Sequence, residues 1–377
     1  MPLTKAGLED VVAANSAICD IIGGEGKLTY RGIDIHELAL HSSFEETTYL
    51  LWFGSLPAEA SLRQFSADLA ARRRLPDEII ALVRRLPSHA RPMDLLRTAV
   101  SALPLYASPV PQGADPTVER ATRVTAQMAT IVAACEQIRR GHEPVEPPRE
   151  GSHAESFLRM LFGGEPDRLA VRAMDLALIL HADHELNAST FAARVTAATL
   201  ADIDAAVVAA IGALSGPLHG GANEQVMRML QAIGEPSEAE AHVVELLAAH
   251  KKVYGFGHRV YRTEDPRVTH LREMSRRLGQ QGGDLRWYEI SRRVEEVVQE
   301  RKHLYPNVDF YSASCYFSMG IPVDMFTPVF AVSRISGWAA HVLEQYADNR
   351  LIRPRAEYVG ERNVPYRPMA ERVRAAG

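Results

Sequence analysis

The sequence predicts an all-α protein with one short β-hairpin near its amino terminus. Apolar residues recur at helical spacing along most of the 377 residues, capping boxes open several of these stretches, and a strand pattern is confined to one place. A single hydrophobic core stops growing at about 250–300 residues, and 46% of this chain is hydrophobic. Two lobes are therefore expected.

The hairpin is predicted where two short stretches, 17–22 and 27–31, flank the turn Gly-Gly-Glu-Gly at 23–26. Glycine tolerates the positive φ angles of tight turns, so this turn between two short apolar stretches is typical of a hairpin. No other pair of strands is predicted.

Helices are predicted along the rest of the chain. The capping box from Ser43 to Glu46 opens a helix that ends at Gly54, and the box recurs at Ser152 and Ser237, each with a glutamate three residues later. Apolar spacing predicts further helices at 58–74, 93–103, 117–140, 153–162, 167–185, 189–200, 203–214, 222–233, 238–250, 267–278, 286–302 and 328–346.

Composition narrows the functional class. The 42 basic and 47 acidic residues leave a net charge of −5, so no overall basic field favours nucleic acid as a partner. Three widely spaced cysteines fit reduced thiols, and the longest apolar stretch is about half of the ~20 residues that span a membrane. We expect a cytoplasmic protein that contacts neither nucleic acid nor membrane.

Two histidines and an aspartate are the best candidates for an acid/base site. His219 and His258 lie between glycines, and Asp309 follows a turn broken by proline; glycine allows sharp turns and the close approach of another molecule. Each residue also has a structural interpretation. His219 could cap the preceding helix, His258 could lie in a solvated basic loop, and Asp309 could be the N-cap of a helix at 310–319.

Arginines near these residues indicate an anionic ligand. Arg262 and Arg267 follow His258, and guanidinium groups bind carboxylates or phosphates, so a di-acid or a nucleotide-bearing cofactor is expected. Arg334 lies in an apolar helix and must meet either an internal carboxylate or a ligand carboxylate. Arg353 lies in an exposed elbow that could reach a neighbouring subunit.

His181 and His184 end the predicted helix 167–185 on one face, which raises the possibility of a metal site. Their spacing matches neither His-Glu-x-x-His zinc sites nor di-iron motifs, so no metal is predicted. A histidine that donates to an anionic ligand is favoured, and stabilisation of the helix end is the alternative.

Six segments, in their order and separation as well as their wording, resemble the citrate synthase family over nearly the whole chain. The segments are LTYRGIDIHELA at 28–39, HADHELNAST at 181–190, SGPLHGGANE at 215–224, GFGHRVYRTEDPR at 255–267, YPNVDFYS at 305–312 and RISGWAAHVLEQ at 334–345.

The resemblance implies a mechanism for the three candidates. Asp309 would remove a proton from the methyl group of acetyl-CoA, and His219 would donate a hydrogen bond to the thioester oxygen. His258 would polarise the ketone of oxaloacetate and protonate it as the carbon–carbon bond forms. Hydrolysis of the thioester would then release citrate and CoA.

The resemblance also implies the binding residues and the assembly. Oxaloacetate would be bound by four side chains, the last from the partner of a homodimer: His184, Arg267, Arg334 and Arg353. CoA, a co-substrate rather than a tightly bound cofactor, would meet Arg262 through its phosphate and the backbone of Val253, Gly255, Phe256 and Gly257 through its adenine.

The implied fold has a large helical domain, residues 1–220 and 325–377, and a smaller inserted helical domain, residues 221–324, with the site in the cleft between them. Two other functions remain open. A 2-methylcitrate synthase acting on propionyl-CoA would use the same acid/base trio, since one methylene changes affinity by only ~1–3 kcal/mol. An inactive regulator that binds CoA or a dicarboxylate would retain the fold without turnover.

Overall fold

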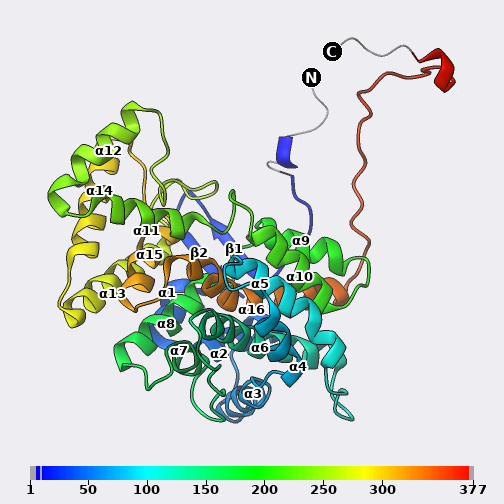
Figure 1. Ribbon diagram of the computed structural model, residues 1–377, viewed down its shortest axis with the longest axis horizontal. Helices are drawn as coiled ribbons and strands as arrows, with labels where there is room; N and C mark the ends of the chain where they lie inside the picture. Colours follow the sequence, from blue (N-terminus) through cyan, green and yellow to red (C-terminus); the bar gives the residue numbers. More distant parts are fainter. Residues whose placement is uncertain (1–5, 9–10, 373–377) are drawn as a thin grey trace.

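The computed structural model describes residues 6–8 and 11–372, so the ends of the expected large domain, residues 1–5, 9–10 and 373–377, lie outside the described part. Within it are sixteen α-helices and one three-stranded antiparallel sheet, which confirms the all-α prediction (Figure 1). No described helix is long and apolar enough to cross a membrane. The strands are β1 (Cys19–Ile22), β2 (Lys27–Tyr30) and β3 (Ile33–Asp34).

The α-helices are α1 (Ile35–His41), α2 (Phe44–Phe53), α3 (Glu59–Ala71), α4 (Asp77–Arg85), α5 (Pro92–Ala102), α6 (Pro116–Arg139), α7 (His153–Phe162), α8 (Arg168–His181), α9 (Ala188–Ala197), α10 (Ile203–Leu214), α11 (Ala222–Ile233), α12 (Ala239–Ala248), α13 (Pro266–Gly282), α14 (Arg286–Lys302), α15 (Val308–Ser318) and α16 (Phe326–Ala347). Short 3₁₀ turns lie at Ala6–Leu8, Leu103–Tyr106, Pro236–Glu238, Val323–Met325 and Met369–Glu371.

The predicted hairpin is confirmed: β1 pairs with β2 so that Cys19 faces Tyr30 and Ile22 faces Lys27. The third strand, β3, was not predicted because two residues are too short to show alternation. Helices α1 and α4, of seven and nine residues, were also missed because they are shorter than the window over which helical periodicity is recognised.

Two of the three predicted capping boxes are confirmed. The hydroxyl of Ser43 accepts a hydrogen bond from the Glu46 amide, and Ser152 does the same for Glu155. The box at Ser237 is wrong, because Pro236–Glu238 forms a 3₁₀ turn and α12 begins behind it at Ala239 without a side-chain cap. Proline at the first position of that turn fixes φ and places Ser237 inside the turn rather than before the helix.

The prediction of one helix over 167–185 is also wrong at its end. Helix α8 stops at His181, so His184 lies beyond it and the two histidines do not share a helical face. The cause is tertiary: the carbonyl of Ala182 accepts a hydrogen bond from the Gly337 amide of α16 at 3.1 Å instead of continuing the helix. A Cβ on Gly337 would lie 2.3 Å from that carbonyl oxygen, so only glycine permits this crossing.

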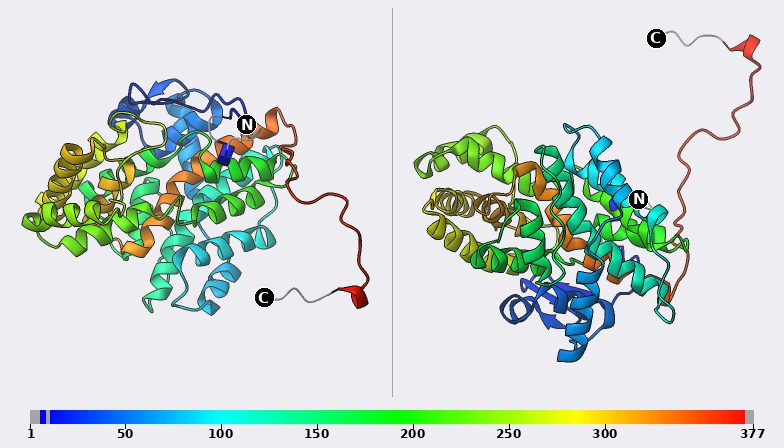
Figure 2. Two further views of the ribbon diagram at one scale, coloured as in Figure 1. Left: turned by 90° about the horizontal axis from the view of Figure 1, so that it is seen from above. Right: turned by 60° about the horizontal axis from the view of Figure 1, so that its bottom comes forward.

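The helices form two groups. Helix α16 is buried along most of its length and packs against α2, α6, α8, α9 and α10, while α11 to α15 pack mainly on one another and gather at one end of the molecule (Figures 1 and 2). Contacts between α8 and α13, α1 and α13, and α11 and α16 join the two groups. After α16 the chain runs away from the body as an extended arm (Figure 1).

Candidate active site

His219 lies in the tight turn between α10 and α11. The amide of Gly220 donates to the carbonyl of Leu214 at 3.0 Å, and a Cβ on Gly220 would come within 2.3 Å of that oxygen, so the turn requires glycine. The imidazole Nε2 accepts a hydrogen bond from the backbone amide of Ser189 at 3.2 Å. A backbone amide can only donate, so the proton of the neutral ring lies on Nδ1. Burial, aided by the charge of Arg334, lowers the pKa of His219 to about 4.

His258 has the opposite arrangement of its ring nitrogens. Its Nδ1 accepts hydrogen bonds from the amides of Val260 at 3.0 Å and Tyr261 at 3.2 Å, so the proton of the neutral ring lies on Nε2. Burial lowers the pKa of His258 to about 4, and the charge of Arg267 acts in the same direction. The ring of His258 is half-buried, whereas Arg259 and Arg262 of the same loop are exposed. Near neutral pH both histidines are uncharged hydrogen-bond donors that present different nitrogens.

The loop of His258 is joined to the turn before Asp309 by a short antiparallel pairing. The amide of Gly257 donates to the carbonyl of Tyr305 at 2.9 Å, and the amide of Asn307 donates to the carbonyl of Gly255 at 2.8 Å. Gly255 has φ of 82°, and a Cβ there would lie 2.8 Å from atoms of the Phe310 ring, so this position also requires glycine.

Asp309 is not the helix N-cap. That position belongs to Asn307, whose side chain accepts from the Asp309 amide at 3.1 Å, so Asp309 lies in the first turn of α15. Burial raises the pKa of Asp309 to about 6, while the charges of Arg267 and Arg334 oppose the rise. No group in the described part of the chain donates a hydrogen bond to its carboxylate. It is therefore a carboxylate of raised basicity with its oxygens free to accept a proton.

Arg267 begins α13 as half of a buried ion pair. Its Nε and Nη2 donate to the two oxygens of Asp265 at 2.9 and 2.7 Å, and both side chains are almost fully buried. The same carboxylate accepts from the amide of Val308 at 3.1 Å, so it also anchors the start of the helix that carries Asp309. The remaining guanidinium donors of Arg267 are free of this bidentate contact.

Arg334 is a buried cation without a carboxylate partner. It is 2% exposed, its Nε donates to the carbonyl of His181 at 2.7 Å, and its guanidinium lies over the ring of Phe330 at 4.7 Å. No carboxylate of the described residues comes within ion-pair distance, and burial lowers the pKa of Arg334. Two partners were expected for Arg334, an internal carboxylate or a ligand carboxylate. Since the described residues supply no internal carboxylate at ion-pair distance, a ligand carboxylate remains the expected partner.

His184 stands against His258. Their rings meet edge to face with centroids 5.0 Å apart, and the Nε2 of His184 lies 3.3 Å from the hydroxyl of Tyr261. Burial and the charge of Arg267 hold the pKa of His184 well below its usual value. The charge of Arg267 or Arg334 acts on the pKa of every acid/base candidate, so each candidate lies within electrostatic reach of at least one of the two arginines: His184, His219, His258 and Asp309.

The remaining candidates lie at the edge or away from this cluster. Arg262 is exposed beside a cavity of about 190 Å³ that Gly257 and His258 also line, and Val253, Gly255 and Phe256 precede it on the same loop. Arg353 is exposed on the extended arm and contacts none of the clustered residues of its own chain. In the described part, no group of three or more His, Cys, Asp or Glu side chains is arranged to hold a metal ion.

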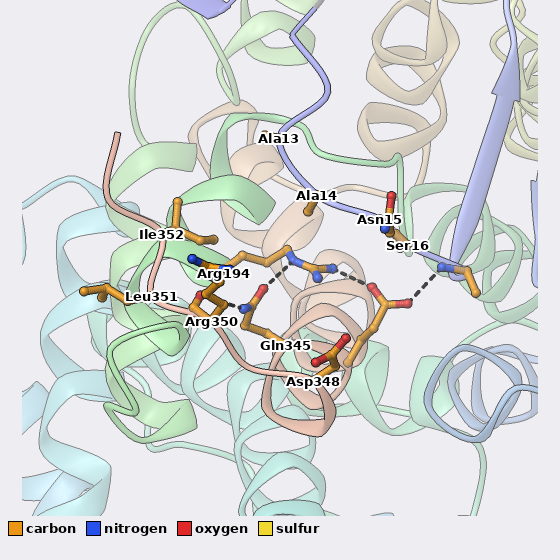
Figure 3. A pocket seen from close by; sticks show the side chains of 12 residues that line it. Ala13, Ala14, Asn15, Ser16, Arg194, Gln345, Asp348, Arg350, Leu351 and Ile352 are labelled. Carbon is orange, nitrogen blue, oxygen red and sulfur yellow. Dashed lines mark hydrogen bonds and ion pairs between the residues drawn. The ribbon is translucent and has the colours of Figure 1, made fainter. Parts of the chain in front are cut away.

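Sequence reasoning missed a buried polar chain behind His184. Nε2 of His341 lies 3.3 Å from the carboxylate of Asp183, and Arg194 donates to the other ring nitrogen at 3.0 Å. Arg194 also pairs with Glu344, which accepts from the Ala17 amide at 2.9 Å (Figure 3). The signal that could have found His341 was the one that singled out Arg334, a polar residue in an otherwise apolar helix.

Figure 3 shows a second cavity, of about 710 Å³, between the amino-terminal segment and the end of α16. It lies where the buried polar residues end at Arg194 and Glu344. Arg194 crosses its floor, and its guanidinium is already held by Glu344 and by Gln345 at 3.1 Å. None of the predicted acid/base residues lines it. The candidate acid/base residues therefore lie outside this cavity.

Comparison with known proteins finds relatives over nearly the whole chain. The family model described as "Citrate synthase, C-terminal domain" matches residues 7–355. The chain is 51% identical to citrate synthase 2 of Bacillus subtilis over 97% of this chain and 99% of that one, and 41% identical to 2-methylcitrate synthase of Shewanella oneidensis over 98% of each. Its fold matches a solved ternary complex of citrate synthase from Thermoplasma acidophilum with carboxymethyl coenzyme A and oxaloacetate, with a TM-score of 0.90 and 34% identity over 97% of this chain and 98% of that one.

Proposed function

The chain belongs to the citrate synthase family, and we propose that it condenses acetyl-CoA with oxaloacetate and hydrolyses the resulting thioester to citrate and CoA. It is an acyltransferase. The observation that supports the proposal is the set of residues itself: two neutral histidines with opposite tautomers and a carboxylate of raised pKa, each within electrostatic reach of one or both of two buried arginines.

Oxaloacetate enters as a dianion. Arg334, buried without a counter-ion, binds one carboxylate, and Arg267 offers the donors that Asp265 leaves free. His184 donates a further hydrogen bond, and the partner chain of a homodimer supplies Arg353. The Nε2–H of His258 donates to the ketone oxygen and draws electron density from the carbon that will be attacked.

The acyl group is activated next. Asp309 removes one proton from the methyl carbon of acetyl-CoA, and the Nδ1–H of His219 stabilises the charge that develops on the thioester oxygen. The enol carbon attacks the ketone carbon, and His258 gives its Nε2 proton to the new alkoxide; the proton that Asp309 took from the methyl group then restores the neutral ring of His258. Water then cleaves the thioester, which releases CoA as the thiol and leaves citrate.

The CoA moiety lies along the loop of His258 in this proposal. Arg262 is exposed and free to meet a phosphate, and the backbone of Val253, Gly255, Phe256 and Gly257 is available to adenine beside the cavity at Gly257. Residues 221–324 then form the small lobe, and residues 1–220 and 325–377 the large one. Closure of one lobe on the other excludes water while the enol exists. We place the enzyme in the cytoplasm.

Release of free thiol from acetyl-CoA, with and without oxaloacetate, tests the activity. We expect release only when both substrates are present. Binding of both without thiol release would favour the inactive regulator and overturn the proposal. The same assay with propionyl-CoA addresses the related condensation that the Shewanella relative's name describes, because a higher kcat/KM for propionyl-CoA would assign the chain to 2-methylcitrate synthesis.

A further inference from the structure

The β1–β2 hairpin contacts both of the segments that carry His184 and His258, the two histidines whose rings lie against each other. At its open end, the buried hydroxyl of Tyr30 donates to the carbonyl of Asp183 at 2.9 Å and accepts from the amide of Asp183 at 3.2 Å. Asp183 immediately precedes His184. At the turn, the carbonyl of Gly23 accepts from the amide of Arg262 at 2.9 Å, four residues after His258. Figure 2 shows the hairpin, in blue, along one edge of the molecule.

The turn is packed against the loop of His258 without space for a side chain. A Cβ on Gly23 would lie 2.2 Å from the carbonyl oxygen of Val260, and a Cβ on Gly26 would lie 2.6 Å from Oγ1 of Thr263. Gly24, in the same turn, has nothing within 4 Å of its Cβ position. Ordinary contact needs about 3.5 Å, so a methyl group on Gly23 would push hairpin and loop apart by about 1 Å.

The amide of Val260 helps to orient the imidazole ring of His258. The amides of Val260 and Tyr261 are the two donors to Nδ1 of His258, and they therefore set both the tautomer and the direction in which Nε2–H points. Tyr261 in turn places its hydroxyl 3.3 Å from His184. A displacement of Val260 would reach the ring of His258 through a single hydrogen bond.

The hairpin is suited to fix the distance between its two contacts, the one at Tyr30 and the one at Gly23. Its strands pair over four residues each, β3 supports β2 from the other side, and a strand rises about 3.4 Å per residue, so about 10 Å separate Tyr30 from the start of the turn. We propose that this hairpin is a positioning element, which sets the place of His258 relative to His184 through the contact of Gly23 with Val260 and Arg262. The role given to His258 rests on the proposed function; the contact does not.

Gly23→Ala tests the proposal, and Gly24→Ala is its matched control. Both substitutions restrict the unfolded chain to the same extent, but only the first creates a close contact. Since a 1 Å misplacement in an active site costs about 100-fold, we expect kcat to fall about 100-fold in Gly23→Ala and to stay within about twofold of the wild type in Gly24→Ala. Equal kcat values in the two variants would overturn the proposal.

Hydrogen exchange of the Arg262 amide gives a readout that needs no activity. We expect faster exchange in Gly23→Ala than in Gly24→Ala, with unchanged exchange in the buried helix α16. A general loss of stability would instead accelerate exchange in α16 as well, and would overturn the positioning role. If Gly23→Ala does not fold, Gly26→Ala meets the same loop at Thr263, and a wild-type kcat in that variant would also refute the role.

The two measurements separate this inference from the proposed function. A wild type that releases no thiol, but whose Arg262 amide exchanges faster on Gly23→Ala substitution, would refute the function and support the contact. An active wild type with identical Gly23→Ala and Gly24→Ala variants would support the function and refute the positioning role.

Discussion

Replacing Asp309 by asparagine separates catalysis from stability. The amide keeps the shape of the side chain but cannot take a proton, and loss of a general base costs roughly 10²–10⁴ in rate. We therefore expect kcat to fall about 10³-fold at pH 8, while the dissociation constant for oxaloacetate changes by less than about threefold because Arg267 and Arg334 remain.

The structure also gives a magnitude for the effect on stability. Burial raises the pKa of Asp309 from 3.8 to about 6, and each tenfold change in acidity corresponds to about 1.4 kcal/mol, so its ionisation disfavours the folded state by about 3 kcal/mol. The folded protein keeps this proton up to about pH 6, whereas the unfolded chain loses it near pH 3.8. The associated stability is complete below pH 3.8 and is lost as the pH rises through 6.

Asparagine cannot ionise, so we expect Asp309→Asn to unfold with a higher free energy than the wild type, by about 3 kcal/mol at pH 8 and about half of that at pH 5. Urea unfolding at the two pH values, together with the thiol-release assay, measures both effects. Asp20→Asn, at an exposed position of β1, is the control and should change neither. Near-normal turnover, or equal stability of Asp309→Asn and wild type at pH 8, would refute the reasoning.

Three further variants test other parts of the site. Arg334→Met should raise the KM for oxaloacetate at least about 100-fold, because it removes a buried cation that has no carboxylate within ion-pair distance; an unchanged KM would place Arg334 outside the substrate site. In the proposed homodimer the partner chain supplies Arg353, so Arg353→Ala should raise the same KM while light scattering gives the same mass as for the wild type; an unchanged KM would place this arginine outside the site. Gly337→Ala should lower the unfolding free energy by about 1–3 kcal/mol in urea melts, since a Cβ there would lie 2.3 Å from the Ala182 carbonyl; a neutral effect would mean that α16 can move aside.

The helix bounds that sequence predicted best are those with local stop signals. Helices α7, α10, α11 and α14 begin and end at the predicted residues, and α7 and α11 end directly before Gly163 and Gly234. Helix α8 was overextended because nothing in His181-Ala182-Asp183-His184 stops a helix locally. Its end is imposed by Tyr30 and Gly337, which are distant in the chain and take the backbone groups of residues 182 and 183.

The residues of the candidate site also fall into two groups, those that local sequence signals reveal and those that they do not. His219, His258 and Asp309 could be singled out because glycine or proline interrupts the helical pattern around each. Asp265 could not, since its position before Pro266 matches an ordinary helix N-cap, and it does cap α13 while it also pairs with Arg267. A residue with two simultaneous roles shows only the local one in its sequence context.

The charges of Asp309 and Arg334 attract each other, which offsets part of the free-energy cost of burying each one. A double-mutant cycle should detect this interaction. The charge of Arg334 lowers the pKa of Asp309, so it stabilises the carboxylate that burial disfavours. Removal of Arg334 alone should leave Asp309 harder to ionise, and removal of Asp309 alone should leave Arg334 with the negative charge of Asp183 but without that of Asp309. The unfolding free energy of the Asp309→Asn/Arg334→Met variant at pH 8 should therefore exceed the value obtained by adding the two single effects. Strict additivity would mean that the two charges do not interact. The arginine proposed to bind oxaloacetate would then have no influence on the basicity of the carboxylate proposed to deprotonate the methyl group.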